Sequence, residues 1–351
     1  MDRTLALAAL IAATLWLGPV VAADDEAPKS EKPATAKDDA EEERDLYSLP
    51  DDADVPTVMA FVKEIQTFRP TSRQQITDHQ KKARIAIQDA ARRILAIEKD
   101  MESEAWLFAK TTELGGEIRS LIAADEGERK EFVASVEKLL QNKKAGRQQL
   151  SLAMQVASML EDVDPPLAAK AFKKFGAALE GNTDQKLAEN ARMLSGAARR
   201  LDLPGHELKL SGNKFDGSKF ELSELKGKVV LVDFWATWCG PCIAEIPNMK
   251  KLYEKYHEQG FEIVGLSLDR DRDDLDKFLE ARKLPWIILH DQEHEGQHPA
   301  ATEYGIFGIP TMMLVGKDGK VLDIHARGEK LAELLEQQFA DDAAAVPAEA
   351  K

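Results

Sequence analysis

The chain has 351 residues, of which 44% are hydrophobic and 31% are charged. That length is enough for two domains, each with its own buried core. The 47 basic and 62 acidic residues leave a formal net charge of −15, which argues against a sequence-independent nucleic-acid binder, because such proteins present a basic surface to phosphate. Only two cysteines are present, Cys239 and Cys242. They are too few for a disulfide-rich scaffold or a Cys-rich metal centre, so the composition points to paired-thiol chemistry.

The first 23 residues have the pattern of an export signal. Arg3 is followed by an apolar stretch over residues 5–17 and by small residues at 21–23, where cleavage would occur. If it is left uncleaved, the apolar run is also long enough to act as an N-terminal membrane anchor. Either outcome places the rest of the chain outside the cytoplasm, in the periplasm or otherwise exported.

Residues 24–52 form an acidic segment. It holds seven Asp and five Glu against three Lys and one Arg, a net charge of −8. It has no apolar periodicity and contains several prolines, so we expect a disordered linker.

From residue 55 to residue 201 the apolar residues recur at helical spacing, with breaks at Gly115-Gly116, Gly146, Pro165-Pro166 and Gly181-Asn182. This pattern predicts six or seven helices packed as a bundle or a short solenoid, and we assign residues 53–202 to an all-helical domain of unknown role. Its single histidine, His79, lies in a charged stretch and is expected at the surface.

Past residue 203 the period changes. Residues 207–210 and 219–222 are predicted to form a hairpin, and the apolar run 229–232 is typical of a strand buried on both faces. A helix then follows the cysteine pair, strands are expected at 261–268 and 286–289 with a helix at 275–284 between them, a hairpin at 311–315 and 320–325, and a last helix at 329–339. Residues 340–351 are expected to be a flexible tail.

This segment resembles the thioredoxin superfamily and, more narrowly, the exported TlpA/ResA-type thiol–disulfide oxidoreductases. The resemblance depends on VVLVDFWATWCGPC at 229–242, on Pro247 and on YGIFGIPT at 304–311. A bare C-x-x-C is a weak signal, but here it follows a buried strand and precedes Gly-Ile-Pro-Thr. The resemblance implies an α/β thioredoxin-like C-terminal domain over residues 203–339, with a central mixed sheet flanked by helices, and an enzyme with no cofactor and no metal ion.

The narrower assignment depends on spacing. The path from Cys242 to the Gly-Ile-Pro-Thr motif is longer than in thioredoxin, and the extra strand and helix resemble the TlpA/ResA insertion. Glu245 resembles the glutamate of that group. Asp233 is a departure, since the group often has Asn there and aspartate is typical of thioredoxin.

The expected chemistry follows from position. Cys239 should stand at a helix N-terminus, where unpaired N–H groups favour the thiolate, and act as the exposed nucleophile on a substrate disulfide. Cys242, one turn in, would resolve the mixed disulfide. Asp233 and Glu245 are both candidates for the base that deprotonates it.

The resemblance also implies a substrate site. Pro310 resembles the family's cis-proline facing the disulfide, Ile309 would present backbone groups to an extended substrate strand, and Trp238 would cover one side of the thiols.

His290, His294 and His298 recur every four residues outside the family pattern. On a helix they could bind zinc or copper, but Gly296 and Pro299 favour a solvated loop. Three functional classes remain open. The first is an exported reductant of client proteins with disulfides or thiols, cytochrome c biogenesis being one setting, recharged by a membrane thiol electron donor. The second is a disulfide oxidant or isomerase of the same fold. The third is a copper-handling protein that uses the thiols and these histidines.

Overall fold

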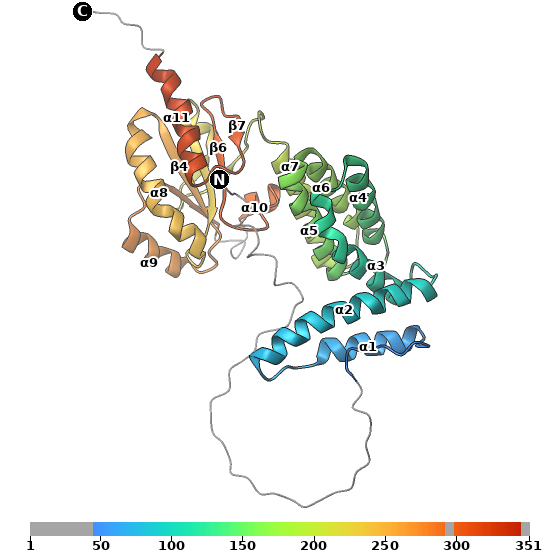
Figure 1. Cartoon of the computed structure of the whole chain (residues 1–351). Helices are drawn as coiled ribbons and strands as arrows, with labels where there is room; N and C mark the ends of the chain where they lie inside the picture. The colour runs from blue at the N-terminus through green and yellow to red at the C-terminus, as the bar shows by residue number, and fades with distance from the viewer. Residues whose placement is uncertain (1–44, 292–297, 345–351) are drawn as a thin grey trace, which may run out of the picture. The chain divides into compact units, whose positions relative to one another are not determined.

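The computed structural model describes residues 45–291 and 298–344. Its first half is helical, as the apolar periodicity predicts (Figure 1). The helices are α1 (Val55–Thr67), α2 (Arg73–Ile97), α3 (Glu104–Glu117), α4 (Glu126–Leu140), α5 (Arg147–Val163), α6 (Pro165–Leu179) and α7 (Gln185–Leu201), with the short 3-10 helix η2 (Ile118–Ile122) after α3.

Polar side chains begin most of these helices. Asp54, Ser72 and Ser103 each accept a hydrogen bond from a backbone N–H in the first turn of the helix that follows. Asp125 and Glu128 form a reciprocal capping box at the start of α4. Each cap accepts hydrogen bonds from backbone N–H groups that a helix leaves unpaired at its N-terminus. Residues within one turn therefore determine where each of these helices begins.

The helical region buries two apolar cores. One joins α1 and α2 with Ala109 of α3, and the other is built by α3 to α7. The segment before α1 contributes to the α1–α2 core: Leu46, Tyr47 and Leu49 pack against it. Residues 46–49, which were expected to belong to a disordered linker over residues 24–52, therefore cover a core instead; residues 24–44 lie outside the described ranges.

This segment also corrects the expectation for His79. His79 is buried, and its Nδ1 lies 2.8 Å from the hydroxyl oxygen of Tyr47. Burial lowers its pKa. The histidine was expected at the surface because its neighbours in sequence are charged, but the residues that cover it come from outside the helix.

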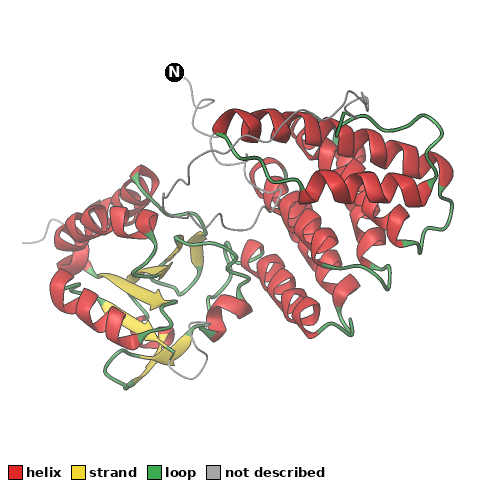
Figure 2. Cartoon of the chain, turned by 90° about the horizontal axis from the view of Figure 1, so that it is seen from below, coloured by secondary structure: helices red, strands yellow, loops and turns green. Residues whose placement is uncertain are grey.

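The second half of the chain contains a mixed five-stranded sheet in the order β5-β4-β3-β6-β7. Its strands are drawn in yellow, with helices around them, in Figure 2. Strands β3, β4 and β5 are parallel, whereas β6 pairs antiparallel with β3 and with β7. The elements are β1 (Ser211–Asn213), β2 (Lys219–Glu221), η3 (Leu222–Leu225), β3 (Val229–Trp235), α8 (Gly240–Tyr256), η4 (His257–Gln259), β4 (Phe261–Ser267), α9 (Arg272–Arg282), β5 (Ile287–His290), α10 (Pro299–Glu303), β6 (Thr311–Val315), β7 (Val321–Asp323) and α11 (Glu329–Ala344). This is the thioredoxin-like architecture expected of the segment.

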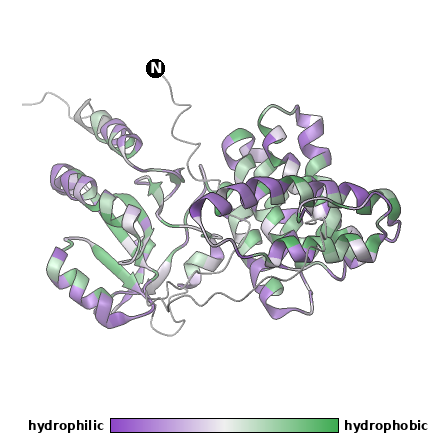
Figure 3. Ribbon diagram, turned by 60° about the horizontal axis from the view of Figure 1, so that its bottom comes forward, coloured by the Kyte–Doolittle hydropathy of each residue, from purple (hydrophilic) through white to green (hydrophobic). Residues whose placement is uncertain are grey.

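The two faces of the sheet bury separate cores. Val229, Leu231 and Trp235 of β3 pack with residues of α8, α9 and α11, whereas Val230 and Val232 face α10 and the β1–β2 hairpin. The alternation follows from the two-residue period of a strand. Both faces are covered, so the central strands are mostly apolar, with Asp233 in β3 and Glu262 in β4 as buried charged exceptions; the strands are mainly green in Figure 3.

Several elements differ from the predictions; among them, helix α9 begins three residues earlier and ends two residues earlier than expected, and strand β7 is shorter at both ends. The first hairpin pairs 211–213 with 219–221 rather than 207–210 with 219–222, because the chain turns at Asp216-Gly217, where Gly217 has a φ of +88°. Strand β5 begins and ends one residue later than expected. Helix α10 was not predicted. Helix α11 runs to Ala344, into the segment expected to be a flexible tail, and residues 345–351 lie outside the described part.

Within the described ranges, no helix is both long enough and apolar enough to cross a membrane. The predicted export signal, residues 1–23, lies outside those ranges.

Candidate active site

Cys239 and Cys242 are joined by a disulfide where β3 leads into α8. Cys239 is the N-cap residue of α8, and its Sγ accepts a hydrogen bond from the backbone N–H of Cys242 at 3.2 Å. The helix N-terminus that the sequence predicted for Cys239 is therefore present. An N–H donor at that position and the helix dipole both favour negative charge on the sulfur.

The two sulfurs are less accessible than predicted. In the disulfide state Cys239 is 5% exposed and Cys242 is 2% exposed, and both belong to the core on the α8 side of the sheet. Cys239 was expected to be exposed, and it is only the more accessible of two buried residues. Trp238, immediately before it, is 68% exposed and forms part of the outer surface of the site.

The loop before β6 reaches the disulfide. The Ile309–Pro310 peptide bond is cis, as the motif implied, and the carbonyl oxygen of Ile309 lies 3.8 Å from the Sγ of Cys239. Thr311 closes the loop by donating its hydroxyl to the carbonyl of Gly308 at 2.7 Å. Backbone groups of Ile309 thus stand next to the reactive sulfur, where an extended polypeptide could pair with them.

Asp233 lies in the middle of β3, on the same face as the cysteines, because its neighbours Leu231 and Trp235 pack into the core that contains them. It is 5% exposed, and its Oδ1 has no hydrogen-bond partner among the described residues. Burial, with the charge of Glu245 as the second cause, raises the pKa of Asp233 to about 8. Near neutral pH this carboxyl can therefore take up or release a proton.

Glu245 lies in the second turn of α8. Its Oε1 accepts hydrogen bonds from the Asn248 side chain at 2.7 Å and from the backbone N–H of Gly328 at 3.1 Å. These contacts tie α8 to the segment before α11. The two candidate acids thus differ in environment: Asp233 is buried with an unpartnered oxygen, whereas Glu245 is held by two donors.

A second buried carboxylate was missed by the sequence reasoning. Asp269, two residues beyond β4, is 2% exposed. It accepts hydrogen bonds from the backbone N–H of Thr237, from the Thr237 hydroxyl at 2.6 Å and from the Ser267 hydroxyl at 2.8 Å. It therefore fixes the turn that ends at Cys239. The sequence does contain a signal for it, since Asp269 is an acidic residue just after the carboxyl end of a predicted strand.

The helical region also contacts the loop between α10 and β6, residues 304–310, which we call the Pro310 loop. A Cβ added to Gly305 would lie 2.1 Å from the backbone N of Ala197 in α7, and one added to Gly196 would lie 2.3 Å from the carbonyl of Thr302. Phe307 packs against the α3–α7 core and stacks on Phe172, with ring centroids 6.1 Å apart. Nothing in the sequence signalled this contact, because the partners are more than 100 residues apart.

The histidines at 290, 294 and 298 are not brought together as a metal site in the described part. His290 is buried at the end of β5 with its Nε2 2.9 Å from the Asp269 carbonyl, and His298 is the buried N-cap residue of α10, so the expected solvated loop is wrong for these two residues. His294 lies outside the described residues. Within those residues, no cluster of three His, Cys, Asp or Glu side chains is placed to hold a metal ion.

Comparison with known proteins finds relatives of the second half of the chain. The Redoxin family model matches residues 203–337. The thiol-disulfide oxidoreductase ResA of Bacillus thuringiensis subsp. konkukian is 38% identical over 122 residues, which cover 35% of this chain and 68% of that protein. ResA of Bacillus anthracis is 41% identical over 121 residues, covering 34% of this chain and 67% of that protein.

Solved structures give similar matches. The thioredoxin domain of a thiol-disulfide oxidoreductase from Bacteroides vulgatus is 32% identical, with a TM-score of 0.35, and the match covers 37% of this chain and 93% of that domain.

Proposed function

Since the chain belongs to the ResA-type thiol–disulfide oxidoreductases, we propose that it reduces disulfides of client proteins outside the cytoplasm through Cys239 and Cys242. The observation that carries the proposal is the position of Cys239: it caps α8 and its sulfur lies against the backbone of Ile309. A sulfur so placed has the charge stabilisation of a nucleophile and a docking edge for a polypeptide beside it.

In the first step the thiolate of reduced Cys239 attacks one sulfur of the client disulfide. A bond forms between Cys239 and the client, the client disulfide breaks, and the other client sulfur leaves as a thiolate. The hydrogen bond from the backbone N–H of Cys242 and the dipole of α8 stabilise the attacking charge. Backbone groups at Ile309 hold the client segment during the exchange.

In the second step Cys242 resolves the mixed disulfide. Asp233 takes the thiol proton of Cys242, and the resulting thiolate attacks the sulfur of Cys239, releasing the second client thiolate and leaving the Cys239–Cys242 disulfide. Two electrons pass to the client in all. With a pKa of about 8, Asp233 is mainly protonated at pH 7, so we assign the proton transfer to its minor ionised fraction, which the raised pKa makes a strong proton acceptor. We assign Glu245 to positioning α8 against the loop at Gly328.

The remaining assignments complete the proposal. Residues 1–23 direct export or anchor the chain, residues 53–202 form a separate helical domain, and residues 203–339 form the redox domain. Because each turnover leaves the pair oxidised, a thiol donor at the membrane must return two electrons to it. The Gly240-Pro241 dipeptide between the cysteines, which matches thioredoxin, supports the reducing direction.

The test is the equilibrium reduction potential of the cysteine pair in the full chain, titrated against glutathione or dithiothreitol. A value near or below about −250 mV is expected of a reductant. A value near about −120 mV would instead make the protein an oxidant, and the proposed direction would have to be abandoned. In parallel, Cys242→Ser should accumulate mixed disulfides with clients in cells, whereas Cys239→Ser should accumulate none.

A further inference from the structure

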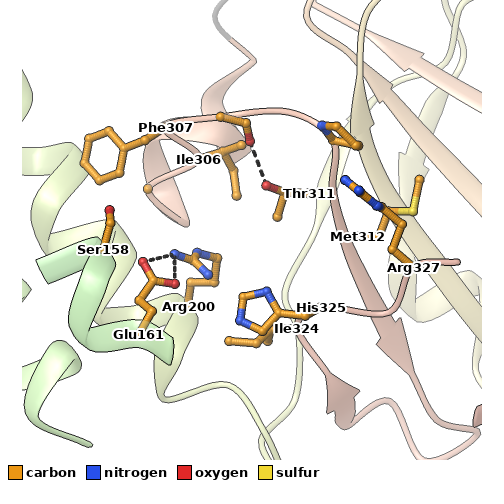
Figure 4. A pocket seen from close by; sticks show the side chains of 13 residues that line it. Ser158, Glu161, Arg200, Ile306, Phe307, Thr311, Met312, Ile324, His325 and Arg327 are labelled. Carbon is orange, nitrogen blue, oxygen red and sulfur yellow. Dashed lines mark hydrogen bonds and ion pairs between the residues drawn. The ribbon is translucent and has the colours of Figure 1, made fainter. Parts of the chain in front are cut away.

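A pocket of about 370 Å³ lies beside the Pro310 loop (Figure 4). One wall comes from the helices α5 and α7, which contribute Glu161 and Arg200. The other comes from the Pro310 loop and from the segment between β7 and α11, which contributes His325 and Arg327. We infer that this pocket binds an acidic side chain of the client polypeptide next to its target cysteine. The inference rests on the proposed function and extends it to a substrate class.

The helical wall is fixed against the loop rather than loosely apposed. The backbones of α7 and of the loop approach so closely at Gly196 and Gly305 that neither position has room for a Cβ. Phe307 is partly buried and packs against the helical core. Since Gly305 and Phe307 both line the pocket, packing against the helices fixes this part of its wall.

The charged groups of the pocket favour an anion. Nη2 of Arg200 donates to both carboxylate oxygens of Glu161, at 3.1 and 3.0 Å, and this pair cancels in charge. Partial desolvation of its ring, and next the positive charge of Arg200, lower the pKa of the exposed His325, so near neutral pH it adds less positive charge than an ordinary imidazole. Arg327 then leaves the lining with a net positive charge.

Arg200 has donor capacity that the ion pair leaves unused. The residue is 6% exposed, and its Nε is buried with no hydrogen-bond acceptor in the described part of the chain. A buried guanidinium with an unpaired N–H is costly unless a further acceptor is supplied. A client carboxylate entering between Arg200 and Arg327, with a small shift of the Arg200 side chain, would provide acceptors for both.

The pocket lies within reach of the exchange reaction. Ile309, whose carbonyl is 3.8 Å from the reactive sulfur, is followed directly by Pro310, which lines the pocket. An extended client chain advances about 3.3 Å per residue, so an acidic residue a few positions from the target cysteine reaches the pocket. Pairing with backbone alone discriminates little between sequences, so side-chain pockets such as this one must provide the selectivity.

The experiment measures second-order rate constants for reduction of disulfide peptides by the reduced full-length protein. The peptides are amidated at the C-terminus, so that only side chains carry carboxylates, and one Glu or its Gln counterpart is placed at each of about five positions on either side of the cysteine. At one or two neighbouring positions we expect Glu to react about tenfold faster than Gln, as a charge-assisted contact implies.

Variants of the pocket residues test whether the preference for Glu over Gln arises in this pocket. Arg327→Gln, and the charge-neutral double variant Glu161→Gln/Arg200→Gln, should bring the Glu-to-Gln ratio toward one. The matched control is Arg192→Gln, which removes the same charge from an exposed position on the same helix α7 and should leave the ratio unchanged. Because the Arg327 side chain is exposed, its variant remains informative even if the double variant does not fold.

The outcomes separate the two proposals. Equal rates for Glu and Gln peptides at every position would overturn the pocket assignment and leave the reductase function intact. So would a preference that Arg327→Gln does not reduce. If no peptide is reduced at all, the proposed reduction of client disulfides fails. The same peptides, in their reduced dithiol form, are then offered to the oxidised protein to test oxidation instead. The client would bind in the same way for reduction and for oxidation. Equal oxidation rates for Glu and Gln peptides would therefore also overturn the pocket assignment.

Discussion

The replacement Asp233→Asn should make the protein more stable at neutral pH. Burial and the charge of Glu245 raise the pKa of this carboxyl from 3.8 to about 8. Above pH 3.8 the unfolded chain therefore ionises Asp233 while the folded chain keeps it protonated, so stability falls as the pH rises toward 8. Asparagine does not titrate in either state, which removes the penalty.

The magnitude follows from the same pKa values. At pH 7 the penalty corresponds to the interval between pH 3.8 and pH 7, about 4 kcal/mol at 1.36 kcal/mol per pH unit, and at pH 5 to about 1.5 kcal/mol. The measurement is native-state hydrogen exchange at the amides of β3 in the oxidised chain, which reports the free energy of opening the sheet separately from that of the helical region.

Asp216→Asn is the matched control. Asp216 is an exposed carboxyl in the turn between β1 and β2, and hydrogen bonds from Ser218 lower its pKa. Its replacement should slightly weaken the protein above pH 3.8, the opposite sign. If Asp233→Asn gains no stability at pH 7, or gains equally at pH 5 and pH 8, the assigned titration is refuted.

The same replacement should slow turnover. Without a carboxylate behind it, Cys242 would lose its proton to water, and general-base catalysis typically contributes about a hundredfold or more. Single-turnover reduction of a disulfide peptide should therefore show normal formation of the mixed disulfide and slow resolution. A variant that is more stable and resolves at the normal rate would remove Asp233 from the proposed mechanism.

Three further predictions concern the loop and turn that frame the disulfide. Gly305→Ala should destabilise the chain by about 3 kcal/mol in thermal or urea unfolding, because the φ there is +56° and the new Cβ would meet the backbone of α7. The control is Gly308→Ala, whose Cβ would meet nothing within 4 Å and which should change stability by less than about 1 kcal/mol. Asp269→Asn should lower the rate of mixed-disulfide formation severalfold by loosening the turn at Thr237, and an unchanged rate together with an unchanged reduction potential would show that the hydrogen bonds at Thr237 do not position Cys239. Pro310→Thr should slow release of the reduced client, so that mixed disulfides persist in a quenched-flow assay. An unchanged rate of mixed-disulfide decay would contradict a substrate-facing role for this loop.

The sequence went furthest where the signal is local. The apolar spacing of residues 55–201 predicts helices, and seven α-helices are present there. The capping residues and prolines that mark their ends act within one turn, so no tertiary information is needed to find them. The same holds for Cys239, which stands at a helix N-terminus because a buried strand ends just before it.

Predictions failed where an outside segment changes a residue's environment. His79 was expected at the surface because its helix is charged, yet Tyr47 and its neighbours cover it. Helix α10 was missed because it spans only residues 299–303 and is held by contacts with α7 rather than by a pattern of its own. Short elements bury too little by themselves to leave a periodic signal.

The sequence by itself therefore determined the helices, the strands and the chemistry of the cysteine pair, since each depends on residues close together in the chain. The tertiary structure decided what surrounds that pair. It placed Asp233 in a buried site that raises its pKa, used Asp269 to hold the turn at Thr237 and set Arg200 of α7 beside the loop of Pro310. The physical reason is that burial, charge and close packing are properties of neighbours in space, and for these residues the neighbours come from distant parts of the chain.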